Sequence, residues 1–426
     1  MDGFVGPSSQ SSFRTMTPRE RMLAAIHGKP TDRLPWAPRM DLWAIGQRAR
    51  GTLPARYEGL GVAGIADVLG VDCHAVRADF PAIPWKERDP FDFVFRSFGL
   101  ENHPHFPFRF ELRDLPFSFE REGSRFRTVI RAPAGVVETV IEYTDAMAVN
   151  GSTTPDVLRR VIEPGDDLEA VAQVYEHLEV VPTPFGYREF SERIGDRGLA
   201  VGSGVISMSP IHAQLHQLMR MDTFFYWWHD DEPALRRLGE RMAPFFERAL
   251  DAACDCEAEV ILWGANYDQD TTWPPFFAAE IVPWAVHVGD RLRGAGKTLL
   301  SHCDGENDRL LPHLPACRFD VAESVCTEPM TRRSLRDLRG GFGSTTTIWG
   351  GLPAVAFQQG AMADDVFERH LERLFGELGS GQQLILGVSD NVPVDADLGR
   401  LHRVTELVRA FGAVTPRPSG LTELTS

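Results

Sequence analysis

The chain lacks an excess of positive charge, a long apolar run and a dense set of cysteines. It has 44 lysine and arginine residues against 60 aspartate and glutamate residues, a formal net charge of −16, whereas nucleic-acid binders present a basic surface. No apolar run reaches the roughly 18 residues that a membrane span needs. Six cysteines in 426 residues are too few for a disulfide scaffold and fit reduced thiols. We therefore expect a soluble, cytoplasmic protein that binds neither nucleic acid nor membrane.

Signals for secretion and for nucleotide binding are also missing. The opening segment MDGFVGPSSQSS lacks the basic start and apolar core of a signal peptide and is typical of a disordered tail. No G-x-G-x-x-G motif follows a predicted strand and no Walker loop is present, so a nucleotide-binding fold has no support. We expect a tail at 1–15, one domain at 16–415 and a second tail at 416–426.

Helix and strand signals alternate through most of the chain. Thr17, Pro18 and Glu20 combine an N-cap, a proline at the first helical position and an acidic first turn, which predicts a helix start. Apolar runs predict short strands at 198–202, 260–263, 298–302, 321–323, 346–349 and 384–387, with helices between them. Repeated strand–helix units predict a parallel sheet in an α/β protein, and this many units favour a closed (β/α)8 TIM barrel.

Residues 91–145 have a different pattern. The runs FDFVFRSF, FRFEL, FRTVIRAP and GVVETVIEYTD alternate apolar and polar residues and are separated by glycine and proline. This pattern is typical of antiparallel strands. We expect an antiparallel β excursion at about 85–150, beside the mouth of the barrel.

Polar side chains follow two of the predicted strands about twenty residues apart. Leu299 and Leu300 lead into His302 and Asp304, and the run at 319–322 leads into Glu323. Side chains alternate along a strand, so His302 and Asp304 point to one face and Cys303 to the other. We predict a divalent-metal site with His302 and Glu323 as ligands, for whose remaining positions Asp304, Cys326 and Asp390 compete. The alternative is a set of polar residues that cap the helices after the strands.

The loop after the 260–263 strand is the second candidate site. It reads Gly-Ala-Asn-Tyr-Asp-Gln-Asp-Thr-Thr and could hold a substrate or could be a solvated turn. Because this strand precedes the His302 strand, a barrel makes the two loops neighbours. We predict Asp268 and Tyr267 as catalytic residues. Predicted substrate-binding residues here are Asn266, Asp270 and Trp273.

Further candidates follow the strand that ends at Trp36. Arg39 is predicted to be catalytic by meeting an anionic group, and Asp41 and Trp43 to bind substrate. Asp390 either faces the same mouth or caps the last helix. A two-histidine metal spacing also occurs at His212 and His216, but the residues around them favour ordinary helix positions.

Three segments resemble the uroporphyrinogen decarboxylase superfamily. They are TPRERMLAA with DRLPW at the start, HCDG with DVAE in the middle, and LGVSDNVP at the end. The resemblance covers roughly residues 16–415 and implies a (β/α)8 barrel with its active site at the carboxyl ends of the strands. This superfamily also holds corrinoid-dependent methyltransferases.

The two branches of the superfamily differ in their site residues. In the methyltransferase branch a His-x-Cys pair, a later Cys and sometimes a Glu hold zinc. Here Asp304 stands where the first Cys would be, Glu323 matches the Glu, and Ser389 or Asp390 stands near the later Cys. The decarboxylase branch grips its tetrapyrrole with an arginine-rich segment, and this chain has Arg39-Met-Asp-Leu-Trp43 there instead.

We therefore expect a zinc-dependent methyltransferase or O-demethylase. It would move a methyl group between a small methylated substrate and a corrinoid protein or another acceptor, with a homodimer among the expected assemblies. Zinc would act as a Lewis acid on the heteroatom that gains or loses the methyl group. One alternative is a cofactor-free decarboxylase of a small or tetrapyrrole acid, in which an Arg holds the carboxylate and an Asp stabilises the protonated intermediate. The other is a non-enzymatic corrinoid- or metal-binding accessory protein.

Overall fold

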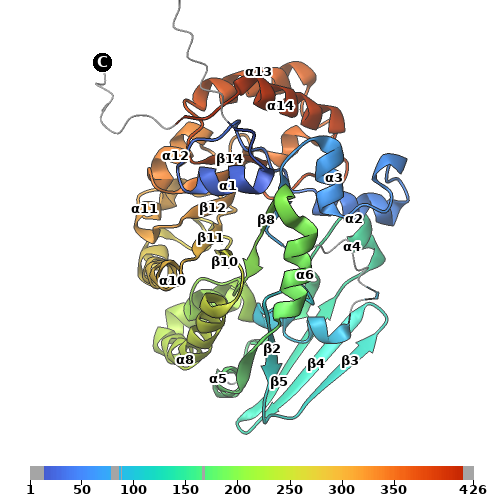
Figure 1. The fold of residues 1–426 in the computed structure, drawn as a ribbon. Coiled ribbons are helices and arrows are strands. Elements are labelled where there is room, and N and C mark those ends of the chain that lie inside the picture. The colour runs from blue at the N-terminus through green and yellow to red at the C-terminus, as the bar shows by residue number, and fades with distance from the viewer. Residues whose placement is uncertain (1–13, 78–85, 88, 166–167, 416–426) are drawn as a thin grey trace, which may run out of the picture.

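A computed structural model describes residues 14–77, 86–87, 89–165 and 168–415 (Figure 1). The predicted tail at 416–426 and residues 1–13 of the predicted tail at 1–15 lie outside the described residues. The chain begins with the predicted capped helix, α1 (Pro18–Ile26), in which the Thr17 side chain accepts from the Glu20 amide and the Glu20 carboxylate accepts from the Thr17 amide.

Six parallel strands form the central sheet, in the order β14-β13-β12-β11-β10-β9. Their register brings side chains at the strand ends level with one another: His302 pairs with Glu323, and Glu323 with Trp349. The alternating α/β pattern and the parallel sheet predicted from the sequence are confirmed. The strands are β9 (Gly202–Ser203), β10 (Val260–Ala265), β11 (Thr298–His302), β12 (Val321–Val325), β13 (Thr347–Leu352) and β14 (Leu384–Val388).

Hydrogen bonds extend this parallel arrangement to the N-terminal part of the chain. Trp36 forms a parallel bridge with Leu386 of β14, and its carbonyl accepts from the Asp72 amide. Asp72 leads into β1 (Cys73–Ala75), which pairs in parallel with β8 (Gly198–Ala200), and β8 continues into β9 after Val201. The strand predicted around Trp36 is thus a single bridge, and the carboxyl ends of all these segments face one edge.

An antiparallel unit stands beside the parallel strands (Figure 1). Its sheet has the order β3-β4-β5-β6, and β2 pairs separately with β7. The predicted excursion is present, but the run FDFVFRSF is not a strand: it forms two short 3-10 helices at Pro90–Phe93 and Arg96–Phe98. Its phenylalanines lie in buried clusters rather than on a pleated face. The strands are β2 (Phe108–Leu112), β3 (Phe117–Glu122), β4 (Arg125–Ala132), β5 (Gly135–Glu142), β6 (Asp156–Arg159) and β7 (Leu178–Pro182).

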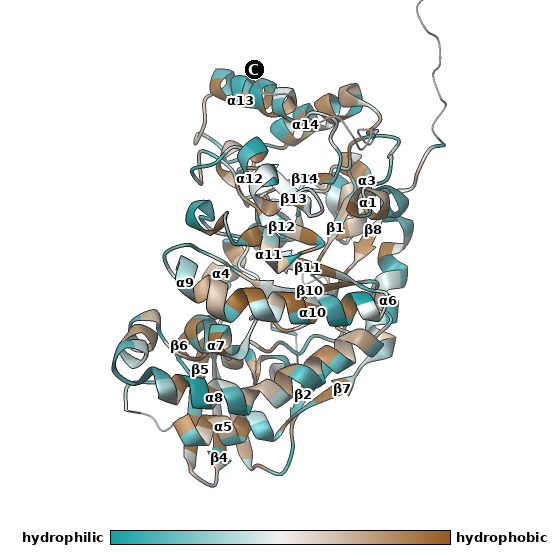
Figure 2. Ribbon diagram, turned by 90° about the vertical axis from the view of Figure 1, so that its left-hand side faces the viewer, coloured by the Kyte–Doolittle hydropathy of each residue, from teal (hydrophilic) through white to brown (hydrophobic). Residues whose placement is uncertain are grey.

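Helices cover the parallel strands, and Figure 2 shows apolar and polar residues alternating along α8 and α10. The longest, α8 (Met221–Asp255), is kinked at Asp231, whose backbone is non-helical. In the part of the chain that the structure describes, no helix combines the length and apolarity needed to cross a membrane. The other α-helices are α2 (Asp41–Arg50), α3 (Val62–Leu69), α4 (Asp145–Val149), α5 (Leu168–Glu176), α6 (Pro184–Ile194), α7 (Pro210–Ala213), α9 (Pro274–Phe276), α10 (Val282–Gly294), α11 (Leu314–Cys317), α12 (Leu335–Phe342), α13 (Asp364–Glu377) and α14 (Leu398–Phe411).

Candidate functional site

One buried carboxylate links two histidines at the carboxyl edge of the parallel strands. Glu323 of β12 is 1% exposed. Its Oε1 lies 2.9 Å from His74 Nε2 of β1, and its Oε2 lies 2.6 Å from His302 Nδ1 of β11. Both carboxylate oxygens therefore accept from an imidazole. The two histidines are far apart in the sequence, yet both contact this one carboxylate.

This contact fixes the charges of His302 and Glu323. Burial alone would lower the pKa of His302, but the Glu323 carboxylate beside it, with Asp390 and Asp304 nearby, raises that pKa above its ordinary value. Burial would raise the pKa of Glu323, but the two imidazoles hold it well below its usual range. The Glu323 carboxylate thus favours the imidazolium form of His302, in which Nε2 is the second N–H donor.

Asp390 connects His302 to a buried arginine. Its Oδ1 accepts from Arg39 Nη1 at 2.8 Å and lies 3.6 Å from His302 Nε2. Arg39 also donates to both oxygens of Asp41, at 2.8 and 3.0 Å. Burial opposes the charge on Arg39, but Asp41 and Asp390 raise its pKa, and Arg39 and His302 lower that of Asp390 against its burial. The structure brings together Arg39, Asp41 and Asp390, and the guanidinium already has these two carboxylates as partners.

The remaining predicted metal ligands lie around this cluster. Asp304 lies near His302 and Asp390, and its burial raises its pKa. Cys326 is buried, which raises the pKa of its thiol to about 11 although Ser389 bonds to it. Cys303 packs in the hydrophobic core, so the predicted alternation of His302 and Cys303 between two faces is present.

The side chains do not form a ready-made zinc site. Among the described residues, no group of three or more His, Cys, Asp or Glu side chains is arranged to hold a metal ion. The donor set gives a reason: both oxygens of Glu323 and Nδ1 of His302 are already used in the contacts between them and with His74. As these side chains stand, Glu323 positions two imidazoles and does not fit as a ligand.

In the predicted substrate loop after β10, one of the predicted residues is exposed, and two others form contacts that hold the loop in shape. Asn266 is exposed, has a positive φ of 60° and donates its backbone N–H to the His302 carbonyl. Asp268 accepts from the backbone amides of Asp270 and Glu306, and Asp270 forms an exposed ion pair with Arg309. Asn266 therefore lies next to the His302 strand, whereas Asp268 and Asp270 hold the loop in shape.

The structure does not bring the predicted aromatic residues to the cluster. Tyr267 is fully buried, and its hydroxyl forms a 2.9 Å hydrogen bond with Ser301 Oγ. Burial raises the pKa of Tyr267 well above its ordinary value. Trp273 packs on Trp228 and Phe276, and Trp43 packs edge-on against Tyr57. In these positions Tyr267 and the tryptophans stabilise packing rather than meet a ligand.

Two histidines of this region were not predicted as functional. His74 lies in β1, a strand too short to give a periodic apolar signal, and the only sign of it in the sequence is the run Asp72-Cys73-His74. His216 lies beside Asn266, whose Nδ2 is 3.0 Å from His216 Nε2. The spacing of His212 and His216 was the available signal: their rings stack at 5.4 Å.

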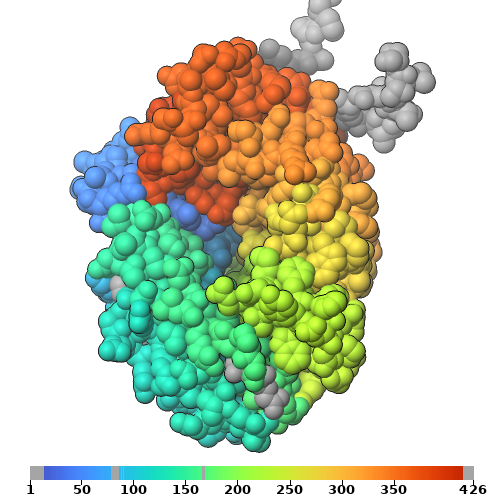
Figure 3. Space-filling view, turned by 180° about the vertical axis from the view of Figure 1, so that it is seen from behind, coloured from blue at the N-terminus to red at the C-terminus, as the bar shows by residue number. Residues whose placement is uncertain are grey.

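The molecule is visibly hollowed on one face. Figure 3 shows a depression where N-terminal segments in blue meet segments in green, yellow and orange-red, so that distant parts of the chain share its rim. Arg39, His216, His302 and Asp390 come from these same parts of the sequence.

Comparisons with known proteins extend the description of the fold. No family model and no curated protein matches this sequence. Among solved structures, a methyltransferase from Methanosarcina mazei is similar, with a TM-score of 0.50 and 14% sequence identity. The likeness covers 93% of this chain and 99% of that one.

Proposed function

We propose that the chain is a methyl-transferring enzyme built on a (β/α)8 barrel. The bridge from Trp36 to Leu386, the Asp72–Trp36 hydrogen bond and the β1–β8 pairing support closure of the parallel strands into a barrel. The fold likeness to a protein named as a methyltransferase supports the reaction class. The observation that carries the proposal is the 2.6 Å contact of His302 Nδ1 with the buried Glu323 Oε2, which favours the imidazolium form of His302 and leaves Nε2 3.6 Å from Asp390 Oδ1.

His302 would act as the acid when a methyl group leaves its heteroatom. An acceptor attacks the methyl carbon, the carbon–heteroatom bond breaks, and its electron pair remains on the heteroatom. His302 Nε2 gives that atom its proton, which avoids release of an alkoxide or phenolate. Because 3.6 Å separates Nε2 from Asp390 Oδ1, the donor is not committed to a protein hydrogen bond.

Glu323 and Asp390 would orient the His302 ring and stabilise its protonated form. Glu323 fixes the ring orientation and keeps the proton on His302, as a carboxylate orients an imidazole in other acid–base pairs. Asp390, held by Arg39, places a negative charge near Nε2 that stabilises the imidazolium. Arg39, neutralised by Asp41 and Asp390, is poorly suited to grip a substrate carboxylate, which disfavours the decarboxylase alternative.

That the enzyme uses zinc and a corrinoid protein remains a prediction based on the resemblance to the superfamily. A corrinoid supplies a strong nucleophile for methyl groups and would enter as the acceptor through a partner. Zinc bound through Glu323 would need this carboxylate to give up a present contact with His74 or His302. No step of the proposed route depends on zinc.

The test is product analysis with methoxylated aromatic substrates and a supplied corrinoid acceptor. We expect formation of the demethylated product, a fall of about 100-fold or more in His302→Gln, and no loss of rate after chelation and removal of metal. Release of CO₂ from an acid substrate without demethylation would replace the proposal with the decarboxylase. Loss of all activity on chelation, restored by zinc alone, would replace the acid route with the metal route.

A further inference from the structure

Arg160 follows β6 and differs from the other arginines near the cluster. Its Nη1 donates to the Gln217 carbonyl at 3.0 Å. Among the described residues, no carboxylate lies within ion-pair distance of its guanidinium, whereas Arg39 has Asp41 and Asp390, and Arg96 has Glu101. Half-buried charges are costly unless they are paired, so this guanidinium is suited to an anionic ligand.

A π-helix places two further polar side chains between Arg160 and His302. It spans Gln214–Leu218 and follows α7 directly. Within it, Gln217 Nε2 lies 2.7 Å from His216 Nδ1, and His216 Nε2 lies 3.0 Å from Asn266 Nδ2. The Asn266 backbone N–H in turn donates to the His302 carbonyl, so a chain of hydrogen bonds joins Arg160 to the backbone of His302. Local π-helical turns are frequent at functional sites.

Positive groups surround the neutral His216 although the whole chain is acidic. Burial first, then Arg160, Arg96 and His302, lower the pKa of His216 to about 4, so its ring is neutral near pH 7. Burial and Arg220 lower the pKa of Arg160 itself despite nearby Glu163. An anion beside Arg160 would offset its repulsion with Arg220.

We propose that Arg160, with His216 and Gln217, binds a carboxylate of the substrate, which makes the substrate a small methylated carboxylic acid. The claim about the methyl end rests on the proposed function, whereas carboxylate binding by Arg160 stands separately. A carboxylate oxygen accepts from the guanidinium, and the second N–H of the Gln217 amide, whose Nε2 contacts His216 Nδ1, provides a further donor. His216 holds this amide in place. The other end of the molecule then extends past Asn266 toward His302 Nε2.

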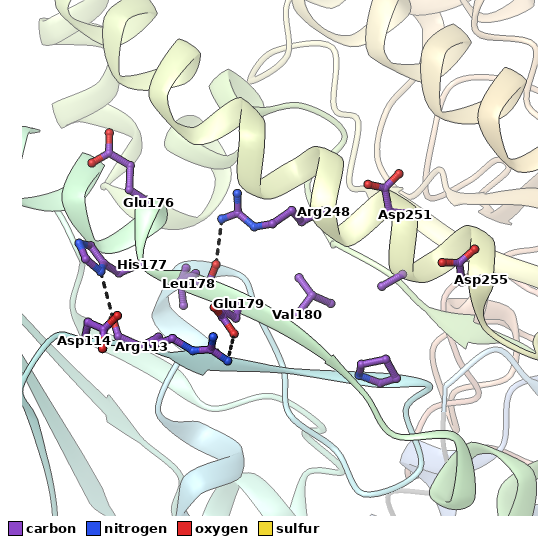
Figure 4. A pocket seen from close by; sticks show the side chains of 12 residues that line it. Arg113, Asp114, Glu176, His177, Leu178, Glu179, Val180, Arg248, Asp251 and Asp255 are labelled. Carbon is purple, nitrogen blue, oxygen red and sulfur yellow. Dashed lines mark hydrogen bonds and ion pairs between the residues drawn. The ribbon is translucent and has the colours of Figure 1, made fainter.

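A second half-buried arginine gives a matched control. Arg248 of α8 also donates to main-chain carbonyls, those of Tyr175 and Leu178. Figure 4 shows the bond to Leu178. It lines an open pocket of about 630 Å³ together with Glu176, Glu179, Asp251 and Asp255. These acidic side chains make that pocket unsuited to an anion, and it carries no proposal.

The test is isothermal titration of the full chain with 4-methoxybenzoate, its 2- and 3-methoxy isomers, and the neutral 4-methoxybenzamide. We expect the wild type to bind at least one of the acids more tightly than the amide. Arg160→Gln should weaken binding of that acid by about tenfold or more, since it removes a charge-assisted hydrogen bond. Arg160→Lys should keep part of the affinity, and Arg248→Gln all of it. Circular dichroism and thermal unfolding check that each variant is folded.

Two results would overturn the carboxylate site. One is unchanged affinity of folded Arg160→Gln for the acid that the wild type binds. The other is no preference of the wild type for any of the acids over the amide. Selective, Arg160-dependent binding without demethylation in the product assay would count against the proposed function and leave the carboxylate site supported.

Discussion

At the scale of single residues, the central feature is the buried Glu323 between two imidazoles. Its two oxygens accept from His74 and His302, and it is 1% exposed. Removing one partner of a buried ion pair leaves an uncompensated charge, which is far more costly than losing an exposed pair. The residue therefore combines a structural role with the positioning of the proposed acid.

Glu323→Gln should lower the free energy of unfolding by about 3 kcal/mol. The pKa of His302 is raised, so its contribution is complete below its ordinary value of 6.5 and is lost as pH rises through the folded value. The pKa of Glu323 is lowered, so its contribution is complete above 4.5 and is lost as pH falls through the folded value. Urea unfolding should show the largest difference from wild type between pH 4.5 and 6.5.

The matched control is Asp270→Asn, which breaks the exposed pair with Arg309. That change should cost less than about 1 kcal/mol and show little dependence on pH in this window. A Glu323→Gln protein as stable as the control variant across the range would contradict a buried ion pair.

At the scale of elements, strands were predictable where apolar runs are bounded by polar residues. The 298–302 strand was predicted with its observed bounds, and the alternation at its end correctly separates His302 from Cys303. FDFVFRSF was misread because its phenylalanines are buried by tertiary contacts, which override local strand propensity. β1 is too short to show a periodic apolar pattern. The contact between His74 and Glu323 depends on the tertiary fold, so the local sequence does not predict it.

The antiparallel excursion has a hydrophobic cluster of its own. Phe126 is 2% exposed and packs with Phe93, Ile141 and Tyr143. Phe126→Ala should destabilise this sheet by about 3–5 kcal/mol, with faster amide hydrogen exchange in β3–β6 and little change in β11 and β12. Leu158→Ala on the same sheet, where Leu158 is 49% exposed, should leave exchange almost unchanged. Equal acceleration in β11 and β12 would show that the excursion and the parallel strands unfold as one unit.

At the scale of the whole molecule, chain topology assembles the site from segments that the sequence keeps far apart. Arg39 and Asp390 are separated by 351 positions, yet their side chains lie 2.8 Å apart. The parallel pattern predicted that strand ends share an edge, and this part of the site was foreseeable. The pairing of individual side chains could not be predicted, because it depends on the bridge from Trp36 to Leu386 and on side-chain packing.

The most direct test of methyl transfer through His302 is the pH profile of kcat/KM for demethylation, measured for wild type and Asp390→Asn. An acid held protonated by neighbouring carboxylates predicts an alkaline fall in rate with an apparent pKa above 6.5, since Glu323 and Asp390 raise the pKa of His302. Loss of the Asp390 charge should move that fall to lower pH. A profile without an alkaline fall, or one whose alkaline limb stays in place in Asp390→Asn, would contradict His302 as the proton donor.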